Sequence, residues 1–178
     1  MRLANKVVVI TGTGDGQGRA AALRFAAEGA TLVGCDLNAT AAALTEEMVR
    51  QAGGTMLSVA PVDLISEDDV RTLIDSAVEG FGRIDRLYNN AAGARMGRAA
   101  DTTEADFDFT FRGVLRIPWL VSKHAAPHLA RSSGAAIVNT ASVSGLVGGG
   151  MVGNSTLTRS ETRFRTVSWG LLRDQGRG

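Results

Sequence analysis

The glycines of residues 11–18 are the first residues of the chain whose type and spacing suit chemistry. The segment reads Thr-Gly-Thr-Gly-Asp-Gly-Gln-Gly, follows the apolar run 7–10 and precedes a stretch of helical composition. This order predicts a buried strand, a sharp turn and a helix whose first N–H groups point at the turn. Such a helix N-terminus attracts phosphate, and glycine permits close approach of the backbone. We interpret the segment as a pyrophosphate cradle, with an ordinary loop as the alternative.

A carboxylate closes the second predicted strand. Asp36 follows the strand-like residues 31–35 and stands 20 residues after Gly16. An acidic residue at about this distance is the expected partner of a ribose 2′-hydroxyl. Because Asp36 would repel a 2′-phosphate, and Asp15 adds a second negative charge in the turn, NAD is favoured over NADP.

Composition and charge narrow the class of protein. The chain has 178 residues and a formal net charge of +1, so we expect one domain over residues 1–178 and no nucleic-acid or membrane partner. Its single cysteine, Cys35, fits a reducing compartment. We identify no leader peptide and no apolar run near the ~20 residues that span a bilayer. We therefore predict a cytoplasmic protein, and we predict no metal site.

Strand-like and helix-like segments alternate along the chain. This alternation favours an α/β fold, a doubly wound parallel sheet with helices on both faces, and right-handed crossovers give the strand order 3-2-1-4-5. Ligands of such sheets bind at the carboxyl ends of the strands, which is where the candidate residues fall. The predicted strands are near 6–11, 31–36, 55–60, 84–89 and 135–141, and the predicted helices near 17–28, 38–52, 66–81 and 103–131.

Together these motifs resemble the short-chain dehydrogenase/reductase family over residues 1 to about 154. Residues 11–18 match the family's cofactor loop, and residues 89–93 resemble its Asn-Asn-Ala-Gly motif, with Ala92 where glycine is usual. Residues 137–145 resemble the fifth strand, which ends in the catalytic serine, here Ser142. The resemblance implies a Rossmann-like dinucleotide-binding domain with NAD as its cofactor. The residues it implies for NAD binding are Gly12, Asp15, Gly16, Gln17, Gly18, Asp36, Leu37, Asp63, Leu64 and Asn90.

Two of these positions have a second interpretation. The family contacts the adenine ring at the position of Asp63, but both Asp63 and Asn90 are residue types that also form turns and cap helices.

The resemblance also implies a catalytic group that this chain largely lacks. The family uses a serine, a tyrosine and a lysine, assisted by an asparagine. Counted from Ser142, the family's spacing puts tyrosine and lysine at Ser155 and Arg159, and the asparagine near Val114. A tyrosine has a pKa near 10 and needs a shift of roughly three units to work near neutrality. A serine hydroxyl is less acidic still, so we predict very low turnover.

Two functions therefore stay open. One is an NAD-dependent oxidoreductase acting on a small alcohol or ketone. The other is a catalytically inactive dinucleotide-binding protein, a truncated homologue that acts by association. The basic segment 155–178 lacks a clear amphipathic period, which fits either a truncated or frame-disrupted product or a specialised relative.

A homo-oligomer is expected on two grounds. A fifth strand without a sixth leaves an open sheet edge, and such edges invite pairing with another chain. In the family, the helix equivalent to 103–131 packs against its counterpart in a second subunit.

Overall fold

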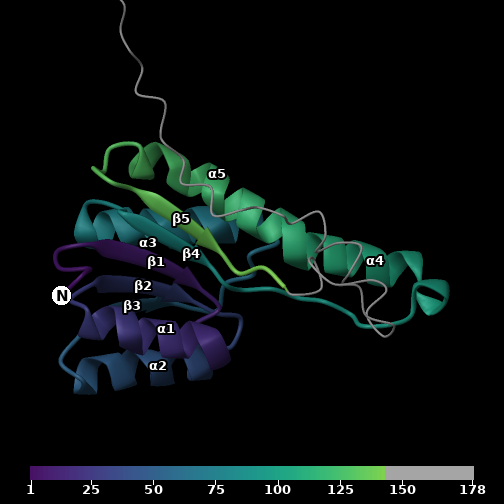
Figure 1. The fold of residues 1–178 in the computed structure, drawn as a ribbon, viewed down its shortest axis with the longest axis horizontal. Coiled ribbons are helices and arrows are strands. Elements are labelled where there is room, and N and C mark those ends of the chain that lie inside the picture. Colours follow the sequence, from purple (N-terminus) through teal and green to yellow (C-terminus); the bar gives the residue numbers. More distant parts are fainter. Residues whose placement is uncertain (143–178) are drawn as a thin grey trace, which may run out of the picture.

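Five parallel strands form the centre of the protein (Figure 1), whose computed structural model describes residues 1–142. The order is β3-β2-β1-β4-β5, and every neighbouring pair is parallel. This confirms the predicted doubly wound α/β sheet and its strand order. The strands are β1 Val7–Thr11, β2 Thr31–Cys35, β3 Thr55–Val59, β4 Arg86–Asn89 and β5 Ala136–Asn139.

Helices cover the two faces of the sheet (Figure 1). Alternate residues of β1 point to opposite faces, so Val8 and Ile10 pack with Ala22 of α1, whereas Val7 and Val9 belong to the core formed with α3 and α5. The α-helices are α1 Gly16–Ala27, α2 Ala39–Gln51, α3 Glu67–Phe81, α4 Glu104–Phe111 and α5 Ile117–Leu129, and Ala99–Asp101 form a short 3₁₀ turn, η1. No helix within residues 1–142 is long and apolar enough to cross a membrane.

The single regular helix predicted over 103–131 is wrong in its middle. A π-helical turn, η2 (Arg112–Arg116), separates α4 from α5, and the Ile117 N–H donates to the Arg112 carbonyl five residues back. Pro118 follows and has no N–H to donate to the regular ladder. Gly113 packs so closely on Gly93 that an added Cβ would lie 2.1 Å from the Gly93 oxygen. The close contact of Gly113 with Gly93 and the missing N–H of Pro118 thus fall at the same π-helical turn.

A cluster of charged side chains ties α3 to α5. Glu67, in the first turn of α3, accepts hydrogen bonds from Lys123 Nζ and His124 Nε2, each at 2.8 Å from its Oε1. The hydrogen bonds from Lys123 and then His124 lower the pKa of the Glu67 carboxyl to about 2.

A buried carboxylate holds the amino ends of the strands. Asp85, fully buried just before β4, accepts a 2.9 Å hydrogen bond from the Val7 N–H at the start of β1. It also accepts hydrogen bonds from Arg83 and from the Ser132 hydroxyl, which lies between α5 and β5. Three segments that are distant in sequence therefore meet on one side chain.

Candidate functional site

A cavity of about 480 Å³ opens at the carboxyl ends of the strands. Its volume falls within the range of small-molecule and cofactor sites. Seven residues predicted from the sequence line it, namely Gly12, Asp15, Asp36, Leu37, Asp63, Leu64 and Asn90. The other three predicted cofactor residues, Gly16, Gln17 and Gly18, form the first turn of α1.

The glycine turn brings α1 against the end of β1. Gly12 has a φ of +74°, a value that favours glycine. A Cβ on Gly18 would lie 1.8 Å from the Gly12 carbonyl oxygen, so only glycine allows this packing. A cradle that a single Cβ would fill, beside a helix N-terminus, fits the pyrophosphate of a dinucleotide.

The N-terminus of α1 also differs from those of the next helices. Asn38, Ser66 and Thr103 cap α2, α3 and α4 by accepting a hydrogen bond from a backbone N–H of the first turn. Asp15, the N-cap residue of α1, makes no such bond within the described part of the chain. The first N–H groups of α1 therefore keep their capacity to bind an anion.

Hydrogen bonds from an arginine of α1 stabilise the glycine turn. Arg19 Nε donates to Thr45 Oγ1 at 2.9 Å, and Thr45 Oγ1 donates to the Thr13 carbonyl at 2.8 Å. The Arg19 guanidinium also donates to the Gly14 carbonyl and lies 3.5 Å from a carboxylate oxygen of the exposed Asp15. Sequence reasoning missed Arg19 and Thr45; the available signal was a basic residue directly after the last glycine.

The Asp36 carboxylate is held at the rim of the cavity. Its Oδ2 accepts from the Gly14 N–H at 2.8 Å, and its Oδ1 accepts from the Asn38 N–H at 2.9 Å. The neighbouring Leu37 is 69% exposed and offers apolar surface at the cavity mouth. Cys35, one residue earlier, is fully buried, and burial raises the pKa of its thiol to about 12. The thiol is therefore protonated at neutral pH and is no nucleophile in this state.

Asp63 and Asn90 both make local contacts of the turn-forming kind. Asp63 Oδ1 accepts from the Ile65 N–H at 3.0 Å. Asn90 Nδ2 donates to the carbonyls of Thr11 and Gly12 at 3.2 and 3.3 Å, and the Asn90 N–H donates to Thr11 Oγ1 at 3.0 Å. These bonds join the end of β4 to the end of β1, while both side chains still line the cavity.

The far wall of the cavity comes from α4, η2 and α5, at three residues that the sequence analysis did not name. Phe109, Gly113 and Ile117 line it together with residues 91–93. Val114, near which the resemblance puts an asparagine, lies in the π-helical turn. One turn earlier, the buried hydroxyl of Thr110 accepts a 3.1 Å hydrogen bond from the Arg95 N–H.

The predicted catalytic residues are only partly within the described chain. Ser142 follows β5 at the same end of the sheet, and Ser155 and Arg159 lie outside the described residues. Two residues before Ser142, Thr140 Oγ1 donates to Tyr88 Oη at 3.0 Å, which connects this segment to β4.

Beside this connection lies a second polar group. Asn89 Nδ2 donates to Asn139 Oδ1 at 2.8 Å and to Ser122 Oγ at 3.1 Å, and Asn89 Oδ1 has no partner among residues 1–142. Within the same residues, no group of three His, Cys, Asp or Glu side chains could hold a metal ion.

Comparison with known proteins gives the site a context. Residues 6–154 match the family model described as short chain dehydrogenase. A meso-2,3-butanediol dehydrogenase from Serratia marcescens is 40% identical over 157 residues, and an uncharacterized oxidoreductase from Thermotoga maritima is 36% identical over 148 residues. Each alignment covers 83% of this chain, but only 57% and 58% of the respective relative.

Solved structures agree with this assignment of the fold. A short chain dehydrogenase/reductase from Burkholderia phymatum in complex with NAD is 32% identical, with a TM-score of 0.83 over 90% of this chain and 57% of that one. A 7α-hydroxysteroid dehydrogenase complexed with NADH and a 7-oxo bile acid is 29% identical, with a TM-score of 0.85 over 90% and 62% of the two chains.

Proposed function

This chain belongs to the short-chain dehydrogenase family, and on that premise we propose that it binds NAD(H) in the cavity at the carboxyl ends of its strands. The observation that carries the proposal is the Asp36 carboxylate, held by the Gly14 and Asn38 N–H groups beside the glycine cradle. An oriented carboxylate suits a ribose diol and repels a 2′-phosphate. The NAD complex of the Burkholderia relative supports the same choice.

Each part of the cavity has a distinct role in this proposal. The N–H groups of α1 and the Gly12–Gly18 contact accommodate the pyrophosphate, and Asp36 accepts hydrogen bonds from the ribose. Leu37 and Asp63 flank the adenine. The chemistry that the cofactor supplies when bound is hydride transfer.

The reaction proposed for this site is oxidation of a small alcohol or reduction of a small ketone. The meso-2,3-butanediol dehydrogenase relative supports this substrate class. Ser142 donates a hydrogen bond to the substrate oxygen and orients it. In ketone reduction the substrate oxygen takes a proton from Ser155 or from solvent, and in alcohol oxidation it gives one up by the same route. Arg159 supplies the positive charge that the family's lysine carries. A serine hydroxyl is a poor general acid near neutrality, so slow turnover is expected.

A second candidate function is NAD(H) binding without turnover, acting by association with another protein. It is favoured by the identity of Ser155 and Arg159 at the positions where the family has tyrosine and lysine. A cytoplasmic location stays a prediction.

The two candidates separate in one pair of measurements. Titration of NADH fluorescence with the purified protein tests binding, and a turnover assay on a panel of small alcohols and ketones tests chemistry. A preference for NADH over NADPH that narrows in Asp36→Ala, together with turnover lost in Ser142→Ala, supports the oxidoreductase. Binding without turnover supports the second candidate, and restored turnover in Ser155→Tyr with Arg159→Lys would locate the missing group. Absence of NADH binding would refute both.

A homo-oligomer is part of the same proposal. Phe107 and Phe111 are four residues apart on α4, and Trp119 lies near the start of α5; they are 41%, 42% and 56% exposed. Exposed apolar side chains in a row indicate an interaction face. We expect a dimer or larger assembly by light scattering at micromolar concentration, and a clean monomer would contradict this.

A further inference from the structure

The loop 60–66, between β3 and α3, forms one side of the cavity at the carboxyl ends of the strands. Residues 62–65 of this loop all line the cavity. Asp63 Oδ1 accepts the Ile65 N–H at 3.0 Å, whereas none of residues 1–142 donates a hydrogen bond to Asp63 Oδ2. The carboxylate of Asp63 therefore keeps one oxygen for a ligand in the cavity.

Hydrogen bonds at both ends of the loop hold its backbone. At its start, the Val62 N–H donates to the Asp36 carbonyl at 3.0 Å, which joins the loop to the end of β2. At its end, the Ser66 N–H donates to the Asp63 carbonyl at 2.9 Å, and the Asp63 N–H donates to Asp69 Oδ2 of α3 at 2.8 Å. All of these bonds stay on the loop's own side of the cavity.

One side chain joins the loop to the far wall of the cavity. The guanidinium of the half-buried Arg116, at the end of η2, donates a hydrogen bond to the Ile65 carbonyl. Its neighbours Gly113 and Ile117 line the far wall, whereas Arg116 is not one of the lining residues. No carboxylate within residues 1–142 forms an ion pair with Arg116. Its recorded partner is therefore the loop, and it acts on the cavity through the loop.

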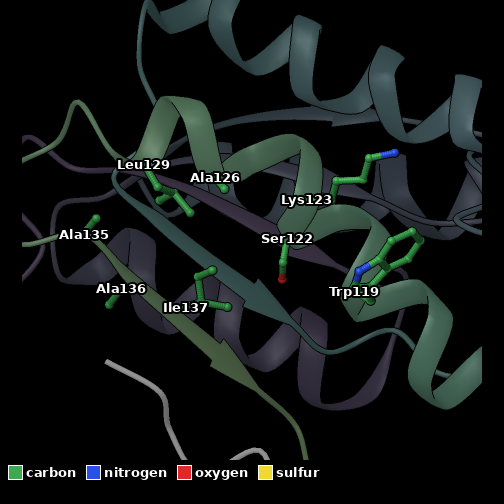
Figure 2. Close-up of a pocket in the computed structure, with 8 residues that line it drawn as sticks. All are labelled: Trp119, Ser122, Lys123, Ala126, Leu129, Ala135, Ala136 and Ile137. Carbon is green, nitrogen blue, oxygen red and sulfur yellow. The ribbon is translucent and has the colours of Figure 1, made fainter. Parts of the chain in front are cut away.

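The helix that follows Arg116 is itself joined to α3. Glu67, the residue directly after the loop, accepts hydrogen bonds from Lys123 and His124 of α5, both at 2.8 Å. Figure 2 shows Lys123 extending from α5 away from Ile137 of β5. Because these bonds hold α5 against the start of α3, Arg116 has a fixed support, and its hydrogen bond sets the position of the loop.

The π-helical turn separates Arg116 from a second arginine. In a regular α-helix, Arg112 and Arg116 would be neighbours on one face. In η2 the Ile117 N–H bonds to the Arg112 carbonyl five residues back, so four residues no longer complete a turn. Arg112 is exposed, and its side chain makes no hydrogen bond or ion pair with residues 1–142. Turns of this kind are frequent at functional sites, and here only Arg116 bonds to the loop.

We propose that Arg116 is a positioning residue for the adenine end of the cofactor. It holds the loop 60–66 against the far wall of the cavity, so that Asp63 Oδ2 accepts a hydrogen bond from the adenine amino group, which is a donor. Arg116 does this without touching the cofactor. The inference rests on the NAD(H) binding proposed above, and it names a residue that acts on that site through another.

Hydrogen exchange of the free protein tests the hold on the loop. Arg116→Met keeps an apolar stem and removes the donors, so the amides of Asp63, Ile65 and Ser66 should exchange at least about tenfold faster than in the wild type. Amides of β2 should exchange as before. If this variant does not fold, Arg116→Gln gives the same comparison. Loop amides that exchange at the wild-type rate would overturn the proposal.

Cofactor discrimination tests what the hold is for. Deamino-NADH has an oxygen in place of the adenine amino group and so has no such donor for Asp63. By fluorescence titration, the wild type should bind NADH at least about fivefold tighter than deamino-NADH, and Arg116→Met should bring the two affinities within about twofold. Equal binding of the two cofactors by the wild type, or an equal loss for both in Arg116→Met, would overturn the proposal.

Arg112→Met is the matched control for both measurements, because it removes the same charge from the same turn. It should leave the loop exchange and the cofactor ratio unchanged, and equal effects in the two variants would refute the role of Arg116. NADH binding by the wild type with no response to Arg116→Met would refute this inference alone. A wild type that binds neither cofactor would refute the proposed function, and with it the role of Arg116 in cofactor binding.

Discussion

Among substitutions in the glycine turn, Gly18→Ala is expected to destabilise the protein most. A Cβ at this position would lie 1.8 Å from the Gly12 carbonyl oxygen, whereas real Cβ contacts essentially never fall under 3.0 Å. Alanine in place of a helical glycine ordinarily stabilises by about 1 kcal/mol. Relieving the overlap moves α1 off the end of β1, and overpacking of this kind costs about 3 kcal/mol.

The expected balance is a loss of about 2 kcal/mol of unfolding free energy, measured by urea denaturation followed by circular dichroism. Because the displaced helix carries the N–H groups of the cradle, NADH affinity should also fall at least about tenfold by fluorescence titration.

Gly80→Ala is the matched control for this substitution. Gly80 lies within α3, and its Cβ would make only an ordinary 3.7 Å contact with Leu57. It should therefore stabilise the protein by about 0.5–1 kcal/mol and leave NADH binding unchanged. A Gly18→Ala variant that unfolds at the wild-type urea concentration, or that binds NADH as wild type does, would refute the reasoning.

Three further outcomes are expected. Asp36→Ala should narrow the preference for NADH over NADPH by about tenfold in parallel titrations, because repulsion of the 2′-phosphate is removed; an unchanged ratio would count against its role. The pKa of Glu67 is lowered to about 2 from 4.5. Its hydrogen bonds to Lys123 and His124 therefore stabilise the fold above pH 4.5, and this stabilisation is lost as the pH falls toward 2. Glu67→Gln should therefore lower the urea midpoint at pH 7 and not at pH 2, and an equal effect at both would contradict this. The buried thiol of Cys35, with its pKa near 12, should resist alkylation at pH 8 in the native protein and react once urea unfolds it; fast native reaction would show that the strand opens.

The strands and the cavity rim could be predicted because they depend on local pattern. β1 and β2 carry runs of buried residues, each followed by a turn, and parallel pairing then puts the carboxyl ends of the strands together. For that reason Asp36, Asp63 and Asn90, which stand far apart in sequence, line one cavity. Their roles in binding NAD(H) remain predictions.

The far wall of the cavity could not be predicted, since it depends on a contact that leaves no periodic signal. The π-helical turn at Arg112–Arg116 changes which residues face the loop 91–93, and Gly113 meets Gly93 through backbone atoms alone. The bonds of Arg19 to Thr45, on a different helix, likewise follow from tertiary packing. Ser155 and Arg159 lie outside the described residues, so their interpretation is still the one that the sequence supports.

The buried Asp85 has a consequence for how this protein tolerates change. It joins β1, β4 and the turn before β5 at the end of the sheet opposite the cavity. Substitutions at the rim can therefore alter what is bound while the strands stay joined at their other end. A change at Asp85 would remove the acceptor of two buried donors, the Val7 N–H and the Ser132 hydroxyl, without touching the ligand site. Substitutions at the carboxyl ends of the strands can therefore change function while the fold is kept. Substitutions at the amino ends are expected to destabilise the fold.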